Sequence, residues 1–148
     1  MEIVRKIPDS ISFIDLVKGE QRVPIRYTPY FVSSIEEFVK TGQMSVCIHH
    51  TVPDYKYQIL GNKYYEISPI DTVGNIISFN NDTMEVIISI DDSYFEDSNS
   101  KYIDKNKLDL YDLSLRSIQS VHHDINDGSL YATIDRLIGF DLILGGKK

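Results

Sequence analysis

Apolar and polar residues alternate with a period of two along most of the chain, and short turn sequences interrupt the alternation. Successive side chains of a strand point to opposite faces, so this pattern predicts strands joined into four hairpins. The first hairpin is expected to pair residues 10–17 with 22–27 around Lys18-Gly19-Glu20. Pro24 lies inside its second arm and indicates an edge strand, because proline lacks the amide hydrogen that a ladder needs.

The third hairpin has the clearest apolar face. Residues 75–80 are predicted to pair with 83–90 around Asn81-Asp82, two residues with strong turn preference. That register sets Phe79 against Met84 and Ile77 against Val86. We therefore expect a core made by four residues: Phe79, Ile77, Val86 and Ile88.

The fourth hairpin turns at Asp127-Gly128, a strong hairpin signal. Its expected inward face carries Val121, His123, Ile125, Leu130, Ala132 and Ile134. Its expected outward face carries His122, Asp124, Tyr131, Thr133 and Asp135. A strand is also predicted over 138–144, whereas 108–115 fits either a helix or a strand.

One short helix is predicted near residue 33. Ser33 and Ser34, each followed three residues later by Glu36 or Glu37, form a doubled capping-box pattern, and Gly42 is a typical helix stop. A helix of about two turns persists only when it packs on other structure. The pattern as a whole predicts a β-dominated α+β fold, in which antiparallel hairpins form a curled sheet, a small barrel or a sandwich with one short helix.

Length and composition limit the organisation of the chain. Its 148 residues, 42% of them hydrophobic, predict a single domain over 1–148, with an acidic loop at 91–107 and a polar tail at 145–148. Cys47 is the only cysteine, which excludes an internal disulfide and a cysteine-rich zinc site. No signal peptide and no apolar run of membrane-spanning length is present. We therefore expect a soluble, cytoplasmic protein without a membrane partner.

The formal net charge of −7 disfavours a nucleic-acid partner, because such proteins neutralise phosphates with basic residues. A recognition surface is instead predicted on the second hairpin, where residues 56–60 pair with 63–67 around Gly61-Asn62. Tyr55, Tyr57 and Tyr64 share its face, and tyrosine is enriched at interfaces. The same rings could equally pack in the core.

All four histidines occur as the adjacent pairs His49-His50 and His122-His123. Strand alternation points one ring of each pair inward and the other outward, and we expect His50 and His123 to be the inward pair. An outward metal site would need His49, His122 and Asp124 together, which requires that their strands be neighbours. No zinc-binding spacing is present, so we predict no metal site, no cofactor and no catalytic residues.

These observations favour a non-enzymatic binding or assembly protein that acts through a β-rich, tyrosine-bearing surface on a protein partner or on a second copy of itself. A motif-free, acidic chain of this kind is what we expect for a structural or accessory protein of a bacteriophage or mobile element. Such a protein would be located in the host cytoplasm or the virion. One alternative is a nucleotide-binding or sequestering protein that uses Tyr57 and Tyr64 with Arg22 or Arg26. The other is a histidine-dependent metal hydrolase.

Overall fold

The computed structural model describes residues 1–42, 45–49, 72–93 and 105–144. Strands dominate this part of the chain, and it contains one α-helix, as predicted. The elements are β1 (Glu2–Lys6), β2 (Ser10–Asp15), β3 (Gly19–Pro24), α1 (Pro29–Thr41), β4 (Ser45–His49), β5 (Thr72–Asn80), β6 (Glu85–Ile90), the 3₁₀ helix η3 (Lys105–Leu110), β7 (Tyr111–His123) and β8 (Leu130–Leu144). No helix among these residues is long and apolar enough to cross a membrane.

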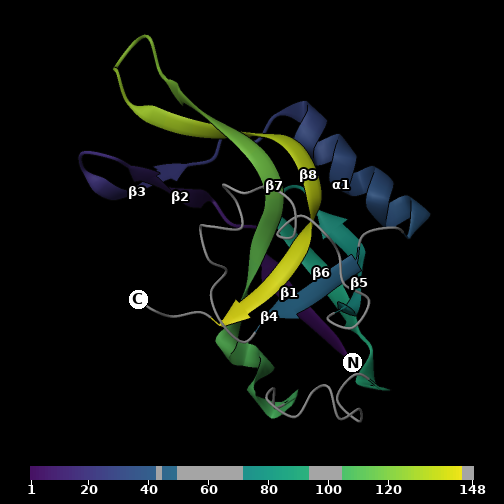
Figure 1. The fold of residues 1–148 in the computed structure, drawn as a ribbon. Coiled ribbons are helices and arrows are strands. Elements are labelled where there is room, and N and C mark those ends of the chain that lie inside the picture. The colour runs from purple at the N-terminus through teal and green to yellow at the C-terminus, as the bar shows by residue number, and fades with distance from the viewer. Residues whose placement is uncertain (43–44, 50–71, 94–104, 145–148) are drawn as a thin grey trace.

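Six strands form one sheet in the order β1-β6-β5-β4-β8-β7 (Figure 1). Neighbours are antiparallel, except that β4 and β8 run parallel. The sheet curls without closing into a barrel. Its two edge strands approach each other through the Arg5 side chain of β1, whose Nε donates to the Tyr111 carbonyl at 2.8 Å and whose Nη2 donates to the Leu108 carbonyl at 2.7 Å.

The long strand β8 connects this sheet to the separate β2–β3 hairpin. Residues 140–143 of β8 pair with β4, and near the other end of β8 Ala132 forms a parallel bridge with Ile25. The Arg26 amide donates to the Ala132 carbonyl at 2.8 Å. The β2–β3 and β7–β8 hairpins both extend to the left in Figure 1, away from α1. The first hairpin forms, but its turn lies earlier than predicted. Residues 16–18 make the turn, Gly19 pairs with Asp15, and Ser10 lies opposite Pro24 at the open end.

The helix begins earlier than the capping-box pattern predicts. Thr28 is its N-cap, and the Thr28 Oγ1 accepts from the Phe31 amide at 3.2 Å, while Pro29 occupies the first turn. Proline suits that position because the first amides of a helix have no intrahelical partner. Ser34 lies inside the helix and donates to the Tyr30 carbonyl. The stop at Gly42 is confirmed, with a left-handed φ of 70°.

The third hairpin is confirmed, but its register differs from the prediction. The turn spans residues 81–84, with Met84 at a positive φ of 59°, so Phe79 pairs with Val86. The ladder then shifts between Ile76 and Ser78, which makes Ile77 the extra residue of a β-bulge. Ile76 is 1% exposed and Ile77 is 44% exposed, so the prediction that Ile77 lies in the core is wrong. Val86 and Ile88 are buried as predicted, and Phe79 packs against the core.

The fourth hairpin is longer than predicted, because β7 and β8 pair from Tyr111–Leu144 to His123–Leu130. The ambiguous segment 108–115 is divided between the end of η3 and the start of β7. The far end of the hairpin extends beyond the core. Ala132 and Ile134 are buried as expected, but Val121, His123 and Ile125 are exposed, which corrects the inward placement of these three. Alternation shows which residues share a face and does not show whether anything covers that face.

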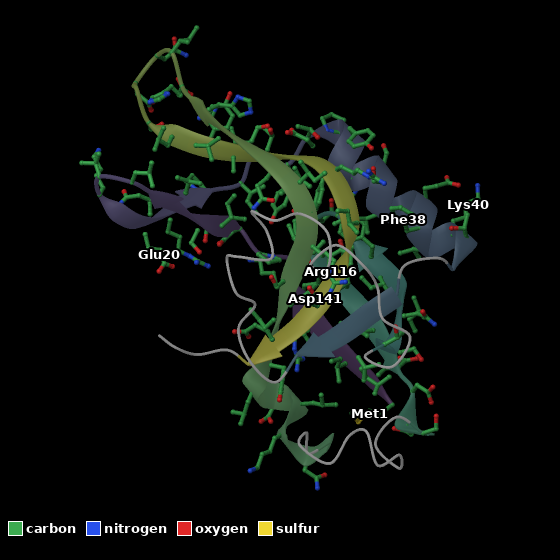
Figure 2. All side chains as sticks on the ribbon, in the orientation of Figure 1. Met1, Glu20, Phe38, Lys40, Arg116 and Asp141 are labelled. Carbon is green, nitrogen blue, oxygen red and sulfur yellow. The ribbon has the colours of Figure 1, made fainter. Side chains whose placement is uncertain are left out.

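A buried ion pair joins Arg116 of β7 to Asp141 of β8 (both are labelled in Figure 2). The Arg116 Nη2 donates to Asp141 Oδ1 at 2.7 Å, and its Nε donates to Asp141 Oδ2 at 3.2 Å. The two side chains are 4% and 0% exposed. Leu115 and Phe140 next to them face the hydrophobic core, so the ion pair projects from the opposite face of the sheet.

Candidate functional site

The tip of the β7–β8 hairpin is an ordered loop of residues 124–129. The Gly128 amide donates to the Asp124 carbonyl at 2.8 Å, and the Asp124 amide donates to the Ser129 carbonyl at 2.7 Å. Gly128 has a φ of 75°, a left-handed conformation that strains a side chain. Asp127 Oδ1 accepts from both the Ser129 amide and the Ser129 hydroxyl, which lowers the pKa of the Asp127 carboxyl. These bonds fix the tip in one shape.

Arg26 attaches this tip to the end of β3. Its Nη2 donates to Asp124 Oδ2 at 2.7 Å, and its guanidinium lies 3.8 Å from the centre of the Tyr131 ring. The hydrogen bond raises the pKa of Arg26 and lowers that of Asp124, whose Oδ1 also accepts from the Asn126 amide. Arg26 is therefore already engaged within the chain. Arg22, the other arginine predicted to bind a ligand, is exposed on β3.

A chain of polar contacts continues along the outward face of the hairpin. Tyr131 stacks on His122, with 5.2 Å between ring centroids. The His122 Nε2 lies 3.0 Å from Thr133 Oγ1, and Thr133 donates to Asp135 Oδ1 at 3.1 Å. Ser120 donates to the other oxygen of Asp135. His122, Tyr131, Thr133 and Asp135 thus share one face, as predicted.

The order of these contacts differs from the order in a catalytic triad. In a catalytic triad the imidazole stands between the hydroxyl and the carboxylate and removes the hydroxyl proton. Here Asp135 accepts directly from both hydroxyls, and Thr133 has already donated its hydrogen. Because Thr133 donates to Asp135, its oxygen accepts from the Nε2–H of His122. The network orients these side chains, and His122 does not stand between a hydroxyl and the Asp135 carboxylate as a triad histidine does.

His49 and His122, the two histidines that an outward metal site would need, lie beside opposite ends of β8. His49 pairs with Ile143 through β4, whereas His122 pairs with Tyr131 through β7. No group of three His, Cys, Asp or Glu side chains able to hold a metal occurs in the described ranges. His50 and the three tyrosines of the second hairpin, Tyr55, Tyr57 and Tyr64, lie outside the described residues.

Both projecting hairpins carry bare apolar side chains at their tips, which the sequence analysis did not select. Leu16 and Val17 in the β2–β3 turn are 99% and 92% exposed, and Ile125 in the β7–β8 tip is 96% exposed. Turns are normally built from glycine, proline, asparagine, aspartate and serine. The sequence does carry a signal for these exposed tips. Two adjacent apolar residues precede Lys18-Gly19, and an isoleucine stands between Asp124 and Asn126.

A groove of about 570 Å³ lies on the other side of β8, against α1. It is lined by apolar, hydroxyl and charged side chains, among them Tyr30, Glu37, Phe38, Arg136 and Ile138. Phe38 is labelled on α1 in Figure 2, on the side of the molecule away from the hairpin tips. Arg136 is exposed and forms no ion pair within the part of the chain that the structure describes.

The fold and these surfaces have no match by which a family could be assigned. No family model matches the chain, and no curated protein and no solved structure is significantly similar to it.

Proposed function

We propose that this chain is a non-enzymatic assembly protein that joins copies of itself through its projecting hairpins. The observation that carries the proposal is the nearly complete exposure of Leu16, Val17 and Ile125 at two hairpin tips. Large apolar side chains grouped on projections mark interaction sites more often than scattered surface residues do. Burying one such side chain contributes about 1.5–3 kcal/mol, so a partner that covers even one tip gains substantial free energy.

The ordered structure of the β7–β8 tip supports a role in binding. Asp124, Asp127 and Gly128 hold the β7–β8 tip in one conformation, and Arg26 links it to β3. A contact surface that is ordered before binding loses less conformational entropy when it binds. The tyrosine-bearing surface predicted on the second hairpin remains a further part of this proposal.

The test is the concentration dependence of the native mass, measured by sedimentation velocity. We expect the wild-type mass to rise above that of the 17.0 kDa monomer as concentration increases. Replacing the tip residues, with Leu16→Ser and Val17→Ser together or with Ile125→Ser, should move the midpoint of association at least tenfold higher.

Ile77→Ser is the matched control, because Ile77 is also exposed but lies in β5, away from both tips. Its midpoint should equal that of the wild type. A wild-type protein that stays monomeric at every concentration contradicts the proposal. So does a control variant that dissociates as readily as the tip variants.

A further inference from the structure

The β7–β8 tip and the α1–β8 groove are complementary in chemistry. The tip presents one apolar side chain, Ile125, beside the exposed carboxylate of Asp127. The groove presents the apolar side chains of Phe38 and Ile138 beside the guanidinium of Arg136. An apolar contact flanked by opposite charges is the arrangement that gives protein interfaces both affinity and a defined register.

We infer that the β7–β8 tip of one copy docks in the α1–β8 groove of the next copy. This inference rests on the proposed function and names the surface that receives one of the two tips. Ile125 enters between Phe38 and Ile138, and Asp127 lies against Arg136. Glu37 also lines the groove and would repel Asp127, so the docked tip must place Asp127 on the Arg136 side of the groove.

A copy cannot fill its own groove with its own tip. The stretch of β8 from Leu130 to Arg136 is strand, and at about 3.3 Å per residue it separates tip and groove by roughly 20 Å. The two surfaces therefore meet only between molecules. Because they are different surfaces of one chain, the contact is head-to-tail, and repetition produces a ring or a filament.

The small area of a single loop in a single groove predicts weak and reversible association for each contact. The net charge of −7 also makes copies repel one another at long range, so the attraction must be local. Reversing one charge at the contact should then have a large effect.

The test exchanges the charges at the contact and measures association by sedimentation velocity. Arg136→Glu alone and Asp127→Lys alone should each move the association midpoint at least tenfold higher. An equimolar mixture of the two variants should associate as the wild type does, because every contact in an alternating chain then joins opposite charges. Arg136→Lys, which keeps the charge, should change the midpoint less than threefold.

Asp127→Asn is a control for the possibility that lysine at this position disturbs the loop. Asparagine removes the charge but can still accept from the Ser129 amide. It should move the midpoint at least threefold higher without a change in the circular dichroism spectrum. An unchanged midpoint for Asp127→Asn overturns the inference.

The result also separates this inference from the proposed function. If Ile125→Ser still blocks association but the mixture of charge variants does not recover it, the tip binds elsewhere. The inference then fails and the assembly function stands. A wild-type protein that is monomeric throughout overturns both.

Discussion

At the scale of single residues, Arg116 and Asp141 form an ion pair that is costly to bury. Both charges are almost completely removed from water, and two hydrogen bonds join them. Removing two charges from water costs several kcal/mol each, which their attraction offsets only when the geometry is good. The bidentate arrangement meets that condition.

We predict that Arg116→Met destabilises the protein by about 3–5 kcal/mol, because it removes the guanidinium and its two hydrogen bonds from the buried Asp141 carboxylate. The double variant Arg116→Met with Asp141→Leu should recover most of that loss. Urea unfolding followed by circular dichroism measures both. A loss below about 1 kcal/mol for the single variant would show that water reaches the pair.

A second prediction concerns Asp124. The hydrogen bond from Arg26 is the main cause that lowers the pKa of Asp124 below its ordinary value of 3.8, so the contact stabilises the folded loop above about pH 4. That stabilisation is lost as the pH falls through the folded pKa. In Arg26→Gln, carboxyl NMR should show the pKa of Asp124 moving back toward 3.8. Asp127 is the internal control, because Ser129 is the main cause of its low pKa. Equal shifts at both residues would contradict this assignment.

At the scale of elements, β5 shows what one extra residue does to a strand. Alternation predicts correctly that β5 and β6 pair and that Val86 and Ile88 are buried. It cannot locate the bulge at Ile77, because a bulge depends on contacts from other strands. The two strands also approach closely at Gly74, where a Cβ would lie 2.0 Å from the Ser89 carbonyl oxygen.

We predict that Ile76→Ala costs about 2–4 kcal/mol of stability, because it opens a cavity in the core. Ile77→Ala should cost less than about 0.5 kcal/mol, the usual range for a surface position. The pair is a matched comparison of one residue type on adjacent positions, measured by urea unfolding. Equal losses would mean that both side chains are covered.

Local sequence patterns do not predict where the helix begins or which hairpin residues are exposed. Thr28 followed by Pro29 is as good a start signal as Ser33 with Glu36, and only packing of Phe31 into the core selects the earlier one. The outward face of the fourth hairpin followed from alternation alone. The exposure of Ile125 did not, because it depends on how far the hairpin extends beyond the core.

At the scale of the whole molecule, β8 connects the six-stranded sheet to the β2–β3 hairpin. The connection at residue 132 consists of one bridge and one backbone hydrogen bond, with the Arg26–Asp124 ion pair beside it. Beyond this connection the β7–β8 hairpin has few buried side chains, since Ile118, Val121 and Ile125 are exposed, and such a region opens at lower free energy than the core. Neither this connection nor the parallel β4–β8 pair was visible in the sequence, since both join segments far apart along the chain.

We predict that amides in residues 118–123 exchange with deuterium faster than those of β5 and β6. Arg26→Gln should accelerate exchange in residues 118–134 further and leave β5 and β6 unchanged. Hydrogen exchange followed by mass spectrometry measures both regions in one experiment. Uniform acceleration across the protein would show instead that the two sheets open as one cooperative unit.

The position of β8 between β4 and β7 also sets the order in which the protein can be completed on the ribosome. β8 is the last described strand to be synthesised, yet it occupies an interior place in the sheet. Until residues 140–143 emerge, β4 has no neighbour on one side, and its backbone groups there remain open to other chains. The nascent chain must therefore wait with an unfinished sheet, and a chaperone that covers β4 during translation would raise the yield of folded protein.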